Sequence, residues 1–167
     1  MKYFLDTEFI EQPNTIQLIS IGIYCENGEK FYAISNEYNE ELANDWVKEN
    51  VIAKLEPEMP RISNTLIKWR VLEFIKRCQK DKSPIEFYGY YSDYDWVVFC
   101  WIFGKMIELP DGFPMYCRDL KQMMDERGLG NEWKNANCPE PEGEHNALID
   151  AEWNYKLYNQ ILTKSTT

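Results

Sequence analysis

The sequence predicts an α/β fold in which α-helices flank a mixed central β-sheet. Two observations support this prediction. The first third of the chain holds three runs of β-type residues separated by turn residues, which is typical of an antiparallel meander. The later part alternates further extended runs with stretches whose apolar residues recur at helical spacing. Because the 167-residue chain has no internal repeat and no linker, we expect one domain over residues 1–162 and a polar C-terminal tail at 163–167.

The first half of the chain accounts for the meander and one long helix. Strands are expected at residues 2–6, 15–24 and 30–34, with a turn at Pro13-Asn14 and a hairpin turn at Asn27-Gly28. Residues 40–50 have helical composition, and residues 51–60 form an irregular connection that contains two prolines. Apolar residues at helical spacing then predict an amphipathic helix at 64–80.

The second half alternates strands and helices. A strand at 85–90 leads through a capping segment, residues 92–95, into an apolar helix at 96–105. Residues 113–117 are expected to form a short fifth strand, followed by a helix at 119–127 that ends at Gly128. Residues 129–144 lack apolar periodicity and predict a long surface loop. A helix at about 147–162 completes the domain.

The charge balance limits the class of function. A formal net charge of −10 argues against a protein that follows phosphate backbones with lysine and arginine. It does not exclude an enzyme that acts on nucleic acid, because divalent cations held by carboxylates can reverse the local field. An acidic protein can therefore still bind the end of an oligonucleotide at a metal centre.

Cysteine usage and hydropathy bear on the compartment. The five cysteines are odd in number and include no Cys-x-x-Cys pair, so neither a zinc site nor a disulfide framework is expected. The longest apolar run, residues 96–103, is too short to span a bilayer. We therefore expect a cytoplasmic protein without a membrane partner.

Three groups of residues could carry chemistry. Asp6 and Glu8 lie two residues apart at the end of a strand, so their carboxylates point to the same side and could share a cation. The same spacing recurs elsewhere in this acidic chain, and only the position at the end of a central strand distinguishes this pair. Asp95 lies at the junction of a strand and a helix, where it could serve a site or merely favour the helix dipole.

His145, the single histidine of the chain, and Asp150 form the third group. Five residues along a continuous helix rotate a side chain by about 140°, so the two side chains could not face one site if both were helical. If Asn146 is the N-cap, however, His145 lies in the preceding loop and Asp150 in the first turns. The two side chains can then converge.

In this order, Asp6-x-Glu8, Asp95 and His145-x4-Asp150 resemble the motifs of the DEDD superfamily of 3′–5′ exonucleases. The histidine places the resemblance in the DEDDh branch, which includes RNase T and oligoribonuclease, and within it in a small single-domain exoribonuclease subgroup. The resemblance implies an RNase H-like fold and two Mg²⁺ or Mn²⁺ ions bound by Asp6, Glu8, Asp95 and Asp150. It also implies that His145 deprotonates the attacking water, that 5′-nucleoside monophosphates are released, and that the protein is a homodimer.

Three aromatic residues close to these motifs, Phe9, Tyr91 and Tyr94, are candidates for stacking on terminal bases. The expected function is therefore a 3′–5′ exoribonuclease acting on single-stranded RNA or RNA 3′ overhangs. Two alternatives stay open: a 3′–5′ exonuclease for single-stranded DNA, and an inactive RNase H-like module that binds nucleic acid. The complete set of carboxylates and histidine counts against the inactive module.

Overall fold

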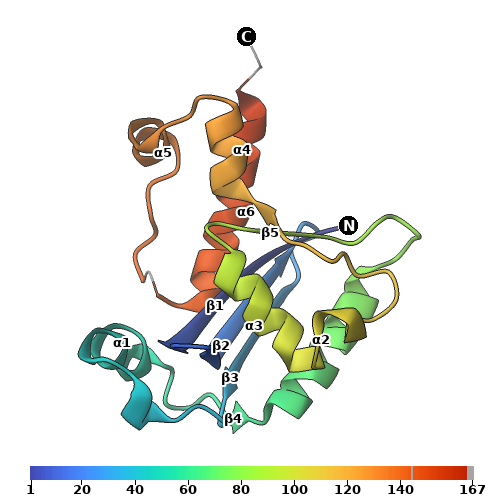
Figure 1. Ribbon diagram of the computed structural model, residues 1–167. Coiled ribbons are helices and arrows are strands. Elements are labelled where there is room, and N and C mark those ends of the chain that lie inside the picture. Colours follow the sequence, from blue (N-terminus) through green and yellow to red (C-terminus); the bar gives the residue numbers. More distant parts are fainter. Residues whose placement is uncertain (144, 165–167) are drawn as a thin grey trace.

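The computed structural model describes residues 1–143 and 145–164. Within these residues, six strands form one mixed sheet in the order β4-β3-β2-β1-β5-β6 (Figure 1). The strands are β1 (Lys2–Gln12), β2 (Thr15–Cys25), β3 (Lys30–Ser35), β4 (Arg61–Ile62), β5 (Glu86–Gly89) and β6 (Arg118–Asp119). The α-helices are α1 (Asp45–Asn50), α2 (Asn64–Cys78), α3 (Asp93–Phe103), α4 (Leu120–Glu126), α5 (Asn131–Asn137) and α6 (Ala147–Thr163). Short 3-10 helices are η1 (Glu40–Leu42), η2 (Ile52–Lys54) and η3 (Met106–Glu108).

The predicted antiparallel meander is confirmed. β1 pairs with β2 and β2 with β3, and Gly28 takes a positive φ of 94° in the turn after β2. β1 is longer than predicted, because residues 7–12 continue the pairing with β2 after a register shift between Glu8 and Phe9. Asp6 and Glu8 therefore lie inside a long central strand rather than at its end.

The parallel strands β1 and β5 pair over only three residues. β1 pairs with β5 from Lys2 to Phe4, whereas β1 itself continues to Gln12. After Gly89 the chain turns away from the sheet and enters α3. The space beside β1 beyond Phe4 is therefore available to side chains from helices. In open α/β sheets, sites commonly form where neighbouring strands end and their connections diverge.

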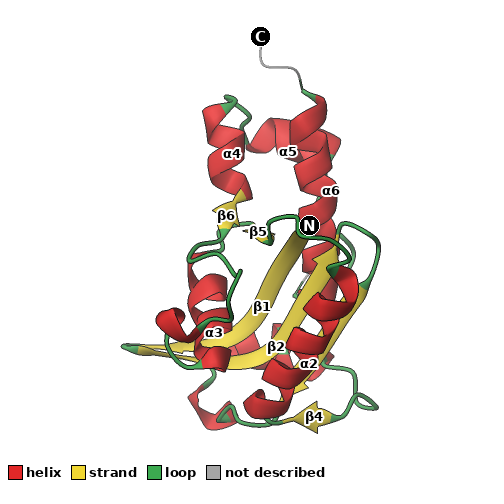
Figure 2. Cartoon of the chain, turned by 90° about the vertical axis from the view of Figure 1, so that its right-hand side faces the viewer, coloured by secondary structure: helices red, strands yellow, loops and turns green. Residues whose placement is uncertain are grey.

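Helices cover both faces of the sheet (Figure 2). Leu5 of β1 belongs to a buried cluster with residues of α2 and α3, whereas the adjacent Phe4 belongs to a cluster with residues of α4 and α6. A third cluster joins Ile10 of β1 to Val51 after α1 and to Ile52 of η2. The alternating side chains of β1 thus face two different helical layers, as expected for a strand buried on both faces.

The predicted strand at 113–117 is wrong. The strand in this region is β6, which is two residues long and begins directly after the predicted range, where Arg118 and Asp119 pair with β5. Phe113 instead packs its ring against Phe87 and Phe99 in the core. The apolar side chain of Phe113 therefore serves core packing rather than strand pairing.

The predicted loop at 129–144 was wrong in part, because it contains helix α5; its last residue, Glu144, lies outside the described residues. The buried residue of α5 is a lysine, Lys134. The helix therefore has no buried apolar stripe that a sequence pattern could reveal.

Helix boundaries differ from the predictions by a few residues. The helix expected at 96–105 is α3, which begins at Asp93 and ends before Gly104. Residues 40–50 form η1 and α1 rather than one helix, and the helix expected at 64–80 ends at Cys78. Thr163, placed in the tail, is the last residue of α6, and residues 165–167 lie outside the described part. Across the described ranges, no helix combines the length and apolar character needed to cross a bilayer.

Candidate active site

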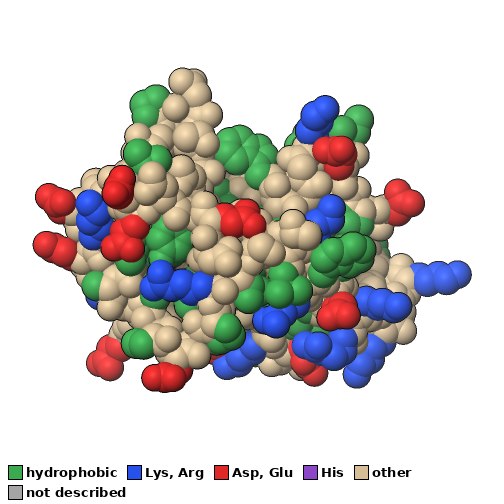
Figure 3. Space-filling view, turned by 90° about the horizontal axis from the view of Figure 1, so that it is seen from below, with side chains coloured by type: hydrophobic (Ala, Val, Ile, Leu, Met, Phe, Trp, Pro, Cys, Tyr) green, Lys and Arg blue, Asp and Glu red, His purple; other side chains and the backbone are tan. Residues whose placement is uncertain are grey.

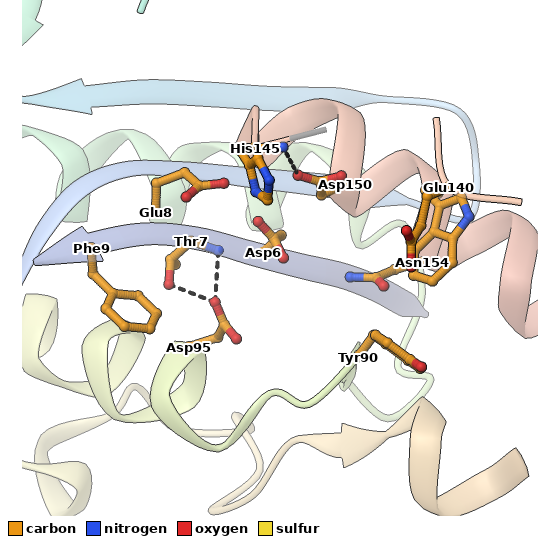
Figure 4. A pocket seen from close by; sticks show the side chains of 11 residues that line it. Asp6, Thr7, Glu8, Phe9, Tyr90, Asp95, Glu140, His145, Asp150 and Asn154 are labelled. Atoms are coloured by element: carbon orange, nitrogen blue, oxygen red, sulfur yellow. Dashed lines mark hydrogen bonds between the residues drawn. The ribbon is translucent and has the colours of Figure 1, made fainter. Parts of the chain in front are cut away.

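β1 directs consecutive side chains toward two helices. Thr7 reaches α3, where its backbone N–H and its hydroxyl both donate to Oδ1 of Asp95, at 2.8 and 2.6 Å. Asp6 and Glu8 point to the other side, toward the start of α6 (Figure 4). This arrangement follows from the two-residue repeat of a strand. A run of three residues, Asp6-Thr7-Glu8, thereby engages helices from both layers.

The junction before α6 is formed as the sequence predicted. Asn146 is the N-cap, and its side chain accepts hydrogen bonds from the backbone N–H groups of Leu148 and Ile149. His145 lies in the preceding loop with a positive φ of 71°, and Asp150 lies in the first turn of the helix. The backbone N–H of His145 donates to Oδ2 of Asp150 at 2.9 Å. The two residues therefore converge.

A glycine in β2 lets α6 approach the sheet at this point. Gly22 is the cross-strand partner of Asp6, and a Cβ placed on Gly22 would lie 2.0 Å from the carbonyl oxygen of Ala147. Real side chains cannot tolerate that distance. The absence of a side chain on Gly22 therefore allows the first turn of α6, which carries Asp150, to lie directly over Asp6.

Three carboxylates meet in this space. Asp6, Glu8 and Asp150 each offer an oxygen atom, and these atoms lie within 4.8 Å of one another. Burial raises the pKa of Asp6 well above its usual range, and the charges of Asp95, Glu8 and Asp150 raise it further. Partly buried carboxylates that repel one another favour a bound cation, and hard oxygen ligands are those that Mg²⁺ and Mn²⁺ prefer. The donor set therefore fits a divalent metal ion.

Asp95 joins the same pocket from the α3 side of β1. It is 7% exposed, and burial raises its pKa to about 6 although the two hydrogen bonds from Thr7 favour the charged form. One of its carboxylate oxygens is thus held by Thr7. Asp95 does not belong to the group of three within 4.8 Å, but it lines the pocket with them.

The pocket has a volume of about 220 Å³. Its lining includes all five residues predicted from the motifs, namely Asp6, Glu8, Asp95, His145 and Asp150. Figure 4 shows the imidazole of His145 on the same side of β1 as Asp6 and Glu8. The structure therefore brings together residues that are up to 144 positions apart in the sequence.

The three predicted base-stacking residues are placed differently. Phe9 lines the pocket, and its ring centroid lies 5.9 Å from that of Tyr94. Tyr91 is 62% exposed and lines a separate shallow surface with Tyr94, toward α4. Phe9 is therefore at the pocket, Tyr94 adjoins it through Phe9, and Tyr91 lies outside its lining.

Further residues at the pocket were not predicted. The additional lining residues are Thr7, Tyr90, Glu140, Trp153 and Asn154. Asn154 follows Asp150 by one helical turn, a spacing that could have revealed it, and its amide donates to the carbonyl oxygen of Leu5 at 3.0 Å. Glu140 forms an ion pair with the buried Lys134 of α5, a contact that the sequence pattern did not indicate.

Comparisons with known proteins find relatives of this chain. The sequence model of the Rv2179c-like 3′-5′ exoribonuclease domain family matches residues 1–162. The 3′-5′ exoribonuclease Rv2179c of Mycobacterium tuberculosis (strain ATCC 25618 / H37Rv) is 38% identical over 153 residues, which cover 90% of this chain and 87% of that protein. The 3′-5′ exoribonuclease MT2234.1 of the CDC 1551 / Oshkosh strain matches with the same values.

Solved structures share the fold. The nuclease domain of 3′hExo, a DEDDh family member bound to rAMP, matches with a TM-score of 0.62 at 10% identity, covering 99% of this chain and 92% of that chain. Cell-death related nuclease 4 (CRN-4) matches with a TM-score of 0.56 at 8% identity, covering 97% and 63%. The predicted RNase H-like sheet with flanking helices is therefore confirmed.

The family match spans the whole predicted domain, and the resemblance to DEDDh exonucleases inferred from the motifs is confirmed. This chain belongs to the Rv2179c-like 3′-5′ exoribonuclease domain family.

Proposed function

We propose that this protein is a metal-dependent 3′–5′ exoribonuclease that shortens single-stranded RNA or RNA 3′ overhangs and releases 5′-nucleoside monophosphates. One observation carries the proposal. Asp6, Glu8 and Asp150 converge within 4.8 Å in a pocket that Asp95 and His145 also line, in a chain of an exoribonuclease family. The arrangement would supply both a cation site and a nearby base.

Asp6, Glu8, Asp95 and Asp150 would bind two divalent cations, Mg²⁺ or Mn²⁺. When bound, such cations neutralise charge on the scissile phosphate and favour ionisation of the attacking water. The protein itself fixes the positions of the carboxylates. Thr7 holds Asp95 from β1, and the first turn of α6 holds Asp150.

His145 would accept the proton of the attacking water at a ring nitrogen. Two features support this role. The hydrogen bond from its backbone N–H to Asp150 ties the loop to the carboxylate cluster. Its side chain also lines the pocket rather than the outer surface of the loop. Asp150 would thus serve both as a metal ligand and as the residue that positions the histidine loop.

Phe9 would stack on the terminal base, with Tyr94 and Tyr91 contacting nucleotides further from the cleavage point. Among the solved structures, one neighbour is bound to rAMP and another recognises the 3′ end of histone mRNA stem-loop, which supports an RNA 3′ end as the partner here. The face seen in Figure 3 displays Lys, Arg and hydrophobic side chains among acidic ones.

We further propose a cytoplasmic homodimer. All five cysteines are free, which suits a reducing compartment. Large apolar side chains such as Trp101, Ile107 and Met115 are 47%, 78% and 52% exposed. Exposed apolar surface of this kind is often covered by a second subunit.

The proposal can be tested with 5′-end-labelled single-stranded RNA and with DNA of the same sequence. We expect a ladder of progressively shorter labelled RNA in Mn²⁺ or Mg²⁺ and no shortening in chelator. Asp6→Ala should abolish the reaction, whereas Asp111→Ala, a change at an exposed position, serves as the matched control. If RNA stays intact, or if Asp6→Ala is as active as the parent, the proposal fails. Shortening of DNA alone would replace RNA by DNA as the substrate.

A further inference from the structure

A tryptophan from a distant part of the chain packs against the single histidine. Trp46 of α1 lies with its ring centroid 4.7 Å from that of His145, at an interplanar angle of 78°. This is an edge-to-face arrangement, which aromatic rings favour. The two residues are 99 positions apart in the sequence. The contact exists because α1 lies beside the end of β1 that carries Glu8 and Phe9, with which Trp46 lines a neighbouring cavity.

Helix α1, which carries Trp46, is held in place at both ends. Asn44 caps α1 by accepting a hydrogen bond from the backbone N–H of Val47 at 2.8 Å. Val51, which follows the helix, is 1% exposed and packs in a buried cluster with Ile10 of β1. A helix fixed at both ends in this way can hold a side chain in a defined position relative to the sheet.

Core packing does not explain a tryptophan at this position. Trp46 is 52% exposed, and α1 buries none of its own residues. About half of the side chain thus stays in contact with solvent, and the indole ring contacts the imidazole of His145. Its ring contact with His145 is directed at the pocket rather than at the core.

The backbone of His145 is fixed, and the contact with Trp46 acts on its ring. Its positive φ and its N–H bond to Asp150 set the main chain, but they do not set the torsions of the side chain. An edge-to-face contact is expected to favour one ring orientation about two- to tenfold over the alternatives. A general base needs such orientation, because its nitrogen must face the proton that it accepts.

We propose that Trp46 is a positioning residue that holds the imidazole of His145 over the carboxylates of Asp6, Glu8 and Asp150. The proposal rests on the proposed function, in which His145 accepts a proton. The competing explanation is that Trp46 stacks on a nucleobase of the substrate in the neighbouring cavity. If Trp46 positions His145, replacing Trp46 changes the orientation of the imidazole in the free protein. If Trp46 only stacks on a nucleobase, the orientation of the imidazole in the free protein stays the same.

The test uses the fact that the chain has one histidine, so that ¹³C,¹⁵N-histidine labelling gives a single imidazole signal set in NMR spectra. Spectra of the metal-free full-length protein are compared for the parent, Trp46→Phe, Trp46→Leu and the control Trp69→Leu, whose indole on α2 is 59% exposed. We expect the three-bond couplings that report the χ1 torsion of His145 to change most in Trp46→Leu, less in Trp46→Phe, and not in Trp69→Leu. Chemical shifts are not the readout, because loss of the indole ring current alone moves them. The same four proteins are then assayed on RNA in Mn²⁺.

In the RNA assay we expect kcat of Trp46→Leu to fall about two- to tenfold with KM unchanged. Trp46→Phe, which keeps an aromatic edge, should recover most of the loss. Unchanged χ1 couplings of His145 in Trp46→Leu, or a raised KM with kcat unchanged, would overturn the positioning role and favour base stacking. A parent protein that cuts no RNA would refute the proposed function, whereas the NMR comparison would still decide whether Trp46 orients His145.

Discussion

Replacing Asp95 by asparagine should stabilise the metal-free protein. Asp95 is 7% exposed, and burial raises its pKa from the usual 3.8 to about 6. The folded protein therefore holds this proton more tightly than the unfolded chain does. The stability that this group contributes is present below about pH 4 and is lost as the pH rises through about 6. Asp95→Asn removes the charge but keeps an oxygen that can accept both hydrogen bonds from Thr7.

The size of the effect follows from the pKa. A rise from 3.8 to about 6 corresponds to about 3 kcal/mol of lost stability at pH 8, where the group is charged in both states. For a protein of this size, that is a change in Tm of about 6–12 °C. The difference between Asp95→Asn and the parent should shrink to about half at pH 5.

Thermal unfolding in chelator, at pH 8 and at pH 5, measures this difference. Asp111→Asn, at an exposed position, is the matched control and should change stability by no more than about 0.5 kcal/mol. Adding Mn²⁺ at pH 8 should stabilise the parent more than Asp95→Asn, because the parent offers the cation one more charge. If Asp95→Asn is no more stable than the parent in chelator at pH 8, or if the difference does not depend on pH, the reasoning is refuted.

Three further variants test the geometry of the site. Gly22→Ala should destabilise the fold by about 3 kcal/mol in urea unfolding, because the new methyl group would collide with the backbone of α6; an unchanged urea midpoint would contradict this close approach. Thr7→Val, which removes the hydroxyl bonded to Asp95, should lower kcat/KM about tenfold, whereas Thr7→Ser should retain it; equal activities would show that the hydroxyl has no role. His145→Ala should lower the rate about 10²- to 10⁴-fold with Mn²⁺ affinity kept, whereas Asp150→Asn should lose both; equal loss of affinity in the two variants would count against this division of roles.

The residues of the site were predictable where local rules decide their placement. Strand periodicity put Asp6 and Glu8 on one side of β1, and the N-cap preference of Asn146 correctly placed His145 in the loop and Asp150 on the helix. Such rules act over a few residues and need no knowledge of the tertiary structure.

Contacts between distant segments could not be predicted in the same way. The Thr7 hydroxyl bond to Asp95 spans 88 positions, and the contact of Trp46 with His145 depends on where α1 meets the sheet. The misplaced strand at 113–117 has the same cause, because Phe113 packs against Phe87 and Phe99 in the core and does not pair in a strand. A sequence pattern shows that a residue will be buried more readily than it shows which partner buries it.

The central claim is that the carboxylates around Asp6 hold the cations on which RNA cleavage depends. The most direct test is to titrate Mn²⁺ into the parent and into Asp6→Asn, following free Mn²⁺ by electron paramagnetic resonance, and to assay both proteins on RNA at each Mn²⁺ concentration. We predict that the parent binds Mn²⁺ and gains activity in parallel, and that Asp6→Asn loses at least about tenfold in affinity together with its activity. Undiminished Mn²⁺ binding by Asp6→Asn, or cleavage by that variant at the parental rate, would contradict the claim.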